Sequence, residues 1–289
     1  MKVQKTRRRL SKKGGVTLLL MFLFVVMAAF ALAGWAENRG PVGPLGQGSA
    51  AAPVDGETLH EAEALAGSDA RLKTISEHPE EYTEALVRLA VNCPEARDFV
   101  LNYPEKKGTV GTIDLTEEAA SDKVPLLLQW DERWGYHTYG AGVIGTTGCG
   151  PTALSMVALY LTGDPSYDPV TVADYAESAG YSDPGNGTQW TLMSEGCRAF
   201  GLIAEELPLD EERMRAALIA ERPVICAMGP GDFTETGHFI VLTGLTEEGF
   251  VVNDPNSIER SERAWTYEEI SGQIRNIWAF DKAPEYWGA

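Results

Sequence analysis

The first strong feature along the chain is a single long apolar run, Val16 to Trp35. About 20 apolar residues can span a bilayer core of roughly 30 Å, whereas the apolar region of a cleaved signal peptide is usually shorter. Ala31-Leu32-Ala33 nevertheless has the A-x-A form of a cleavage site. We therefore expect residues 1–36 to be an export signal, and the length of the run favours an uncleaved transmembrane anchor over a cleaved signal peptide.

The segment before this run is basic and carries seven cationic residues, Lys2, Lys5, Arg7, Arg8, Arg9, Lys12 and Lys13. Because such a flank stays in the cytoplasm, everything after Glu37 is expected on the far side of the membrane. We therefore expect a single-pass protein of the cell membrane with its functional part outside the cell, or a secreted protein.

Two regions of different pattern follow. Residues 37–56 repeat Gly, Pro, Ala and Ser without apolar periodicity, which is typical of a flexible spacer. Residues 57–123 have helical spacing, in which Leu86 and Leu89 share one face and Pro94 opens a further short helix. We expect this helical segment to pack against or present the next domain, and a propeptide that blocks the site is the alternative.

Residues 124–281 combine an apolar helical stretch, Thr152 to Leu161, with later strand-like runs. The four runs are Val224 to Met228, His238 to Leu245, Phe250 to Asn253 and Asn276 to Phe280. A helix followed by strands predicts an α+β domain, with residues 282–289 as a tail. The chain has no Gly-rich phosphate loop and no Cys or His pair at zinc-ligand spacing, so we expect no metal and no cofactor.

The charge distribution changes the picture of possible partners. The chain has 24 Lys and Arg against 42 Asp and Glu. Seven of the cationic residues precede the apolar run and every acidic residue follows it, which leaves the exported part with a net charge of −25. Nucleic acid and anionic lipid are therefore not expected partners. This acidity favours solubility, and attraction of cationic substrates is the alternative.

The most informative motif is Gly148-Cys149-Gly150-Pro151, directly before the apolar helical stretch. Proline is favoured in the first turn of a helix, so Cys149 is expected at the helix N-terminus. There the free backbone N–H groups and the helix dipole favour a thiolate, and the glycines let a substrate approach closely. We predict that Cys149 is a nucleophile; a packed thiol or a disulfide partner is the alternative.

A histidine at the start of an apolar strand is the predicted base. His238 follows Gly237, whereas the other three histidines lie in polar surroundings. The strand that returns toward it ends at Asn253-Asp254, and a carboxylate there could orient the imidazole. With a four-residue turn, Asn253 rather than Asp254 shares the sheet face of His238, whereas a bulge would select Asp254.

Other residues are weaker candidates. Gln129 follows an apolar run, Val124 to Leu128, predicted as a strand, and its side-chain N–H could stabilise an oxyanion. Gly148, Gly150, Gly237 and Trp190 are expected to bind substrate, although Trp190 also suits a core position. Cys93, Cys197 and Cys226 are interpreted as packed thiols, and Cys197 with Cys226 is the best disulfide candidate.

Taken together, Gln129-Trp130, Gly148-Cys149-Gly150-Pro151, Gly237-His238-Phe239 and Asn253-Asp254-Pro255 resemble the peptidase C-39-like family, relatives of the bacteriocin-leader-processing cysteine peptidases. The resemblance covers about residues 124–280. It implies a papain-like fold, with a helix that carries the nucleophile packed on an antiparallel sheet. It also implies Cys149 as nucleophile, His238 as base, Asp254 as its orienter and Gln129 at the oxyanion. Gln129 lies 20 residues before Cys149, farther than in compact papain-like enzymes.

The motifs and the resemblance predict an extracellular cysteine peptidase, monomeric, that acts on a peptide or protein substrate through an acyl-enzyme. Two alternatives stay open. One is a non-catalytic module that binds peptide or cell-wall material in the same cleft. The other is a transpeptidase or amidase that shares the acyl-enzyme chemistry.

Overall fold

The computed structural model describes residues 54–183 and 187–284. The predicted anchor, the A-x-A site, nearly all of the spacer and the end of the tail lie outside the described residues. Within the described ranges, no helix combines the length and the apolar character needed to cross a bilayer.

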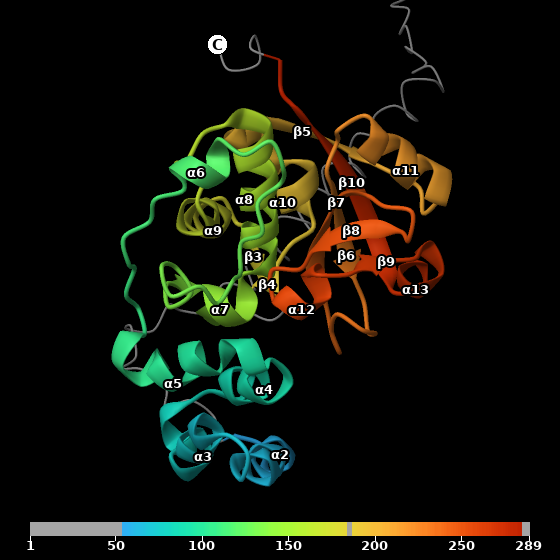
Figure 1. The fold of residues 1–289 in the computed structure, drawn as a ribbon. Helices are drawn as coiled ribbons and strands as arrows, with labels where there is room; N and C mark the ends of the chain where they lie inside the picture. Colours follow the sequence, from blue (N-terminus) through green and yellow to red (C-terminus); the bar gives the residue numbers. More distant parts are fainter. Residues whose placement is uncertain (1–53, 184–186, 285–289) are drawn as a thin grey trace, which may run out of the picture. The chain divides into compact units, whose positions relative to one another are not determined.

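The first part of the predicted helical segment, up to Lys106, consists of four helices joined by short turns (Figure 1). These are α2 (Gly56–Ala66), α3 (Ala70–Glu77), α4 (Glu84–Asn92) and α5 (Arg97–Lys106), with 3-10 turns at Pro79–Glu81 and Pro94–Ala96. The side chains of Asp55 and Asp69 accept hydrogen bonds from the first turns of α2 and α3, as helix-capping residues do. The expected apolar face of α4 is buried, including Leu86 and Leu89.

The helical segment packs against the chain that follows it. Its apolar cluster also contains Tyr136 and Val143, and the ring of Phe99 on α5 stacks on Tyr136 with 4.4 Å between centroids. Phe99 lies so close to Gly145 that a Cβ there would come within 2.3 Å of its ring. The expectation of packing is therefore met by direct contacts.

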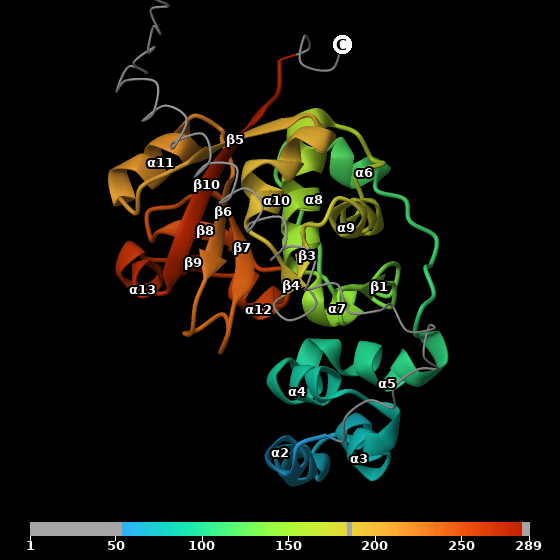
Figure 2. The same ribbon diagram turned by 180° about the vertical axis from the view of Figure 1, so that it is seen from behind.

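A six-stranded antiparallel sheet forms the centre of the rest of the chain (Figures 1 and 2). The strand order is β5-β10-β6-β7-β8-β9. The strands are β5 (Leu202–Glu206), β6 (Val224–Met228), β7 (His238–Leu245), β8 (Phe250–Asn253), β9 (Ala264–Trp265) and β10 (Ile274–Lys282). The four predicted strands are therefore present, and the fold is a mixture of helices and antiparallel sheet.

Helices cover both faces of this sheet. Helix α8 (Cys149–Thr162) packs on one face against β7 and β10, and α11 (Glu211–Ile219) packs on the other against β6 and β7. The shorter elements are α6 (Thr116–Ala119), β1 (Thr138–Tyr139), β2 (Gly142–Val143), α7 (Ile144–Thr147), α9 (Pro169–Ser178), β3 (Ser182–Asp183), β4 (Gly187–Thr188), α10 (Thr191–Ser194), η3 (Gly196–Phe200), α12 (Ile258–Ser261) and α13 (Tyr267–Ser271).

The predicted disulfide candidate, Cys197 with Cys226, is wrong, because the two residues lie on opposite faces of the sheet. All four cysteines of the chain are described and free, and the three predicted to be packed thiols are buried. Cys197 belongs to the apolar cluster on the α8 side, together with Ile225 and Ala227 of β6. Cys226 belongs to the cluster on the α11 side, because successive side chains of a strand point to opposite faces. The sheet therefore separates the two thiols.

The prediction of a strand at Val124 to Leu128 is wrong, because this segment is not paired with any described strand. It is extended and held by other contacts. The amide nitrogen of Asn253 donates to the carbonyl oxygens of Val124 and Pro125, at 3.1 and 3.0 Å. The backbone N–H of Gln129 donates to the carbonyl of Pro255 at 2.7 Å. These bonds tie Gln129 to the end of β8.

Candidate active site

Cys149 is the first residue of α8, as the sequence predicts. It is half-buried and lines a cleft of about 690 Å³. The adjacent glycines do not line that cleft, and they matter for packing instead. A Cβ on Gly148 would lie 2.7 Å from the Ile144 carbonyl oxygen, and a Cβ on Gly150 would lie 2.6 Å from the Thr188 hydroxyl. Close packing of the backbone therefore sets the position of the sulfur.

His238 is the first residue of β7 and lies in the same cleft. Its Nε2 lies 2.7 Å from Oδ1 of Asp254, which leaves Nδ1 for other partners. Burial disfavours the charged ring, but the charge and hydrogen bond of Asp254, followed by a hydrogen bond with Cys149, outweigh it and raise the pKa of His238. The ring is therefore held between the sulfur and the carboxylate.

A β-bulge decides which residue faces His238. In the β7–β8 pair Leu245 faces Phe250, whereas Leu242 faces Val252 and Val241 faces Asn253, so one extra residue of β7 lies between Leu242 and Gly244. Without it, Asn253 would share the face of His238. With it, Asp254 does, and this is the bulge alternative considered from the sequence.

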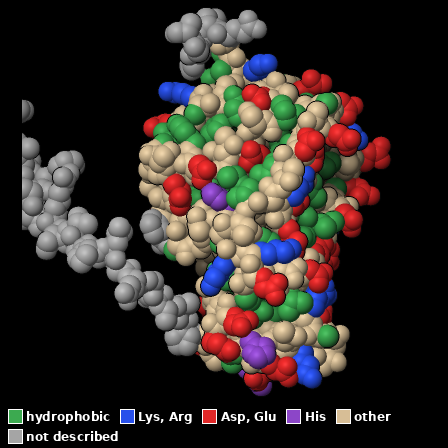
Figure 3. Space-filling model, turned by 90° about the vertical axis from the view of Figure 1, so that its left-hand side faces the viewer, with side chains coloured by type: hydrophobic (Ala, Val, Ile, Leu, Met, Phe, Trp, Pro, Cys, Tyr) green, Lys and Arg blue, Asp and Glu red, His purple; other side chains and the backbone are tan. Residues whose placement is uncertain are grey.

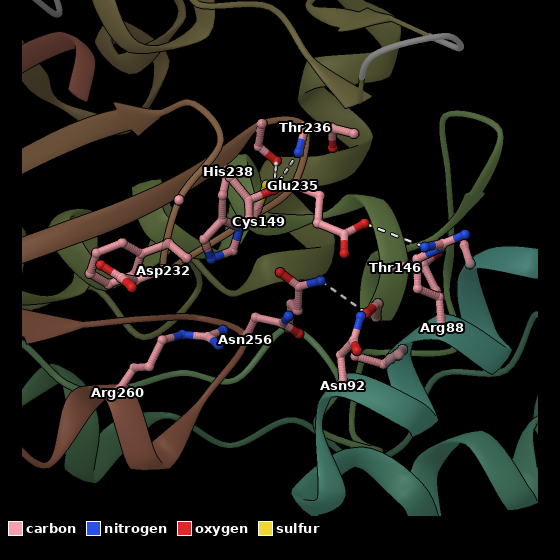
Figure 4. A pocket seen from close by; sticks show the side chains of 18 residues that line it. Arg88, Asn92, Thr146, Cys149, Asp232, Glu235, Thr236, His238, Asn256 and Arg260 are labelled. Atoms are coloured by element: carbon pink, nitrogen blue, oxygen red, sulfur yellow. Dashed lines mark hydrogen bonds and ion pairs between the residues drawn. The ribbon is translucent and has the colours of Figure 1, made fainter. Parts of the chain in front are cut away.

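Asp254 is wholly buried and shared between two cationic groups. Its Oδ1 also accepts from the backbone N–H of Asn256 at 2.7 Å, and its Oδ2 accepts from Nε of Arg260 at 2.5 Å. Burial raises the pKa of this carboxyl, but the charges and hydrogen bonds of His238 and then Arg260 outweigh it and lower the pKa overall. Arg260 lines the cleft beside His238 and was missed from the sequence (Figure 4).

Gln129 lines the cleft as well, with 4% of its surface exposed. Its Nε2 donates to the carbonyl of Gly145 at 2.9 Å, and its Oε1 is buried without a hydrogen-bond partner. An amide nitrogen carries two hydrogens, so one remains for a further acceptor.

The other wall of the cleft comes from helix α4. Ala85, Arg88, Leu89 and Asn92 line it, and Arg88 and Asn92 are seen across the cleft from Cys149 and His238 in Figure 4. The apolar periodicity of the sequence predicted which face of α4 is buried, but it did not indicate which side chains of α4 face the cleft. Arg88 and Asn92 were therefore missed.

The four predicted substrate-binding residues have different positions. Gly237 lines the cleft, in the loop that precedes His238. Gly148 and Gly150 do not, for the packing reason above. Trp190 is 47% exposed and outside the cleft, and its ring meets Trp278 edge-on with centroids 6.0 Å apart. The expectation that Trp190 binds substrate therefore finds no support in this arrangement.

Two chemical properties of the surroundings bear on function. Across residues 54–183 and 187–284, no group of three His, Cys, Asp or Glu side chains could hold a metal ion. Figure 3 shows acidic side chains spread over the face in view, with basic ones between them, rather than collected in one patch.

A comparison with protein-family models agrees with the resemblance drawn from the motifs. A family model described as the Peptidase_C39 like family matches residues 121–283, more than half of the chain. A search of curated proteins finds no match. One similar solved structure is of a candidate C39-like peptidase from Bacillus anthracis, at 17% identity and a TM-score of 0.35. The match covers 56% of this chain and 97% of that one.

Proposed function

We propose, from the premise that this chain belongs to the Peptidase C39-like family, that it is a cysteine peptidase with Cys149 as nucleophile and His238 as general base. The observation that carries the proposal is that Cys149, which begins a helix, lines the same cleft as His238, whose Nε2 is bound by Asp254 and whose Nδ1 is left for the sulfur. The N-terminus of a helix favours a sulfur anion, and a neighbouring imidazolium favours it further. The arrangement of α8 on the sheet fits a papain-like fold.

In the first half of the reaction the sulfur of Cys149 attacks the carbonyl carbon of a peptide bond. The carbonyl oxygen becomes an oxyanion, to which the backbone N–H of Cys149 and the remaining hydrogen of Gln129 Nε2 can donate. When the C–N bond breaks, the proton of His238 passes to the leaving amine. The product of this half is an amine and a thioester of Cys149.

In the second half a water molecule attacks the thioester. His238 accepts one proton of this water and the C–S bond breaks, which restores the Cys149 thiolate and the His238 imidazolium. The product acid gives the other proton to solvent and leaves as a carboxylate. No oxidant, reductant or metal enters this sequence of steps. Its requirements are one sulfur, one imidazole and donors for the oxyanion.

Asp254 acts on His238 rather than on substrate. Its bond to Nε2 directs Nδ1 toward the sulfur and stabilises the imidazolium. Arg260 is a positioning residue for Asp254, because its bond to Oδ2 restrains the carboxylate and compensates its charge.

We further propose that the peptidase works outside the cell, held by a membrane anchor at residues 16–35. This part of the proposal rests on the basic flank and on the apolar run in the sequence. Labelling of intact cells with a thiol reagent that cannot cross the membrane tests it, because Cys149 would react only if it faces the outside.

The central test is turnover of a mixed peptide pool under reducing conditions by the parent protein and by Cys149→Ala. We expect new amino termini with the parent and none with Cys149→Ala. Peptide binding that survives in Cys149→Ala, with no turnover by the parent, would instead identify a binding module. Added amines distinguish transpeptidation, because the acyl group would then appear on the amine.

A further inference from the structure

Helix α4 lies outside the part of the chain that the family model matches, yet it supplies one wall of the cleft. The opposite wall includes the loop from Gly231 to Gly237, directly before His238. A peptide that reaches Cys149 therefore passes between the loop and a helix of the preceding segment. This helix is placed to select among peptides.

The cationic group on this wall is Arg88, which two partners hold from behind. Its Nη2 donates to Oε1 of Glu84 at 2.8 Å and to the hydroxyl of Thr58 at 3.0 Å. Glu84 is fixed in turn, because it accepts from the backbone N–H of Asp55 at 2.7 Å and from Thr58 at 2.5 Å. The guanidinium is thus oriented before any ligand arrives.

The other terminal nitrogen, Nη1, is turned to the opposite wall (Figure 4). There it contacts a single carboxylate, Oε2 of Glu235, at 3.3 Å. Glu235 belongs to the loop and its side chain is 72% exposed. Exposed ion pairs contribute little to stability, so an incoming carboxylate can displace Glu235 at small cost. The loop carboxylate marks the place that a ligand carboxylate would take.

We propose that Arg88 is a specificity-determining residue, which binds a carboxylate of the peptide substrate in exchange for Glu235. The proposal rests on the proposed function of the cleft. Arginine suits this task because its planar fork of N–H groups matches a carboxylate. The net negative charge of the protein is spread over its surface and screened beyond about 8 Å at physiological salt, so the local partners of Arg88 decide the preference.

The test uses peptides capped with a chloroacetyl group, in which the sulfur of Cys149 displaces chloride. Paired probes carry Glu or Gln at each position in turn, and a further pair ends in a free carboxylate or an amide. We expect one Glu probe, or the free-carboxylate probe, to label Cys149 about tenfold faster than its neutral partner. Which pair responds tells a side-chain carboxylate from a C-terminal one.

Variants assign the preference to Arg88. Arg88→Gln should abolish the ratio between paired probes, Arg88→Lys should retain part of it, and Glu235→Gln should increase it because the competing carboxylate is gone. The matched control is Arg213→Gln, an exposed position on α11 outside the cleft. A ratio of one in the parent protein, a preference for Gln, or a ratio that Arg88→Gln leaves unchanged would overturn the proposal.

Iodoacetamide labelling separates this outcome from failure of the proposed function. The reagent is small and neutral, so its rate reports the reactivity of Cys149 without the α4 wall. If Cys149 reacts no faster than Cys93 in the folded protein, the peptidase proposal fails. If Cys149 reacts fast and the paired probes do not differ, only the role of Arg88 fails.

Discussion

Nε2 of His238 lies 2.7 Å from Oδ1 of Asp254, although regular pairing of the hairpin would turn Asn253 toward His238 instead. The extra residue of β7 between Leu242 and Gly244 produces this relationship. Asn253 is released for a different task, and its amide binds the carbonyl oxygens ahead of Gln129. A single bulge therefore places the Asp254 carboxylate next to His238 and also frees Asn253 to anchor the segment that carries Gln129.

Replacing His238 should slow alkylation of Cys149. In His238→Ala the sulfur loses the imidazolium that stabilises its anion, so iodoacetamide should react about 100-fold more slowly at neutral pH. Mass spectrometry of the labelled peptide measures the rate. His137→Ala is the control, because His137 pairs with Asp174 outside the cleft. Equal rates for His238→Ala and the parent would contradict the assignment of the base.

The neighbours Asn253 and Asp254 should have separable effects. Asp254→Asn removes the charge that stabilises the imidazolium, and turnover should fall by about 100-fold or more. Asn253→Ala loses two hydrogen bonds and should reduce the free energy of unfolding by about 1–3 kcal/mol, with smaller loss of turnover. Steady-state kinetics and urea unfolding of both variants provide the comparison. The reverse pattern would place Asn253 at the base.

Stability should depend on pH through the His238–Asp254 pair. The pKa of Asp254 is lowered, so its contribution is present above about pH 4 and is lost as pH falls through the folded-state pKa. The pKa of His238 is raised to about 10 in the folded state. Its contribution to stability is therefore fully present below about pH 6.5 and is lost as pH rises through the folded-state pKa. The melting temperature of the parent should exceed that of Asp254→Asn most between these limits. A difference that stays constant with pH would contradict this.

Loss of Arg260 should shift the pH profile of Cys149 labelling. In Arg260→Gln the carboxylate of Asp254 has only His238 as a cationic partner, so the His238 imidazolium persists to higher pH. The alkaline limb of the labelling profile should therefore move to higher pH. Arg260→Lys should move it less. Arg263→Gln, whose side chain pairs with Glu269, is the control. A lower rate with unmoved limbs would indicate a purely structural role.

A bulky residue on α4 should obstruct peptides but not small reagents. Ala85 is exposed and lines the cleft, so Ala85→Trp should reduce labelling of Cys149 by chloroacetyl peptides about tenfold. Iodoacetamide should label Cys149 of Ala85→Trp at the same rate as Cys149 of the parent protein. Ala64→Trp, at an exposed position of α2, tests for general effects of the substitution. Parallel loss with both reagents would mean that the substitution distorts the site rather than narrowing it.

Local patterns in the sequence predicted a large part of this molecule. The helix that Cys149 begins, the strand that His238 begins and the apolar face of α4 all depend on residues within a few positions of one another. Two predictions failed because they concerned contacts between segments that are distant in the sequence. The candidate partners Cys197 and Cys226 lie on opposite faces, and the run before Gln129 has no strand partner in the described chain.

By itself the sequence predicted the candidate nucleophile and the candidate base, because a glycine-flanked cysteine before a helix and a histidine at a strand start are local features. Only the tertiary structure decided that Asp254 faces His238, that Arg260 binds the second carboxylate oxygen, and that Arg88 meets Glu235 from 147 residues away. The physical reason is that capping and periodicity act between neighbours along the chain. A β-bulge between paired strands and the walls of a cleft arise only when segments distant in the sequence come together.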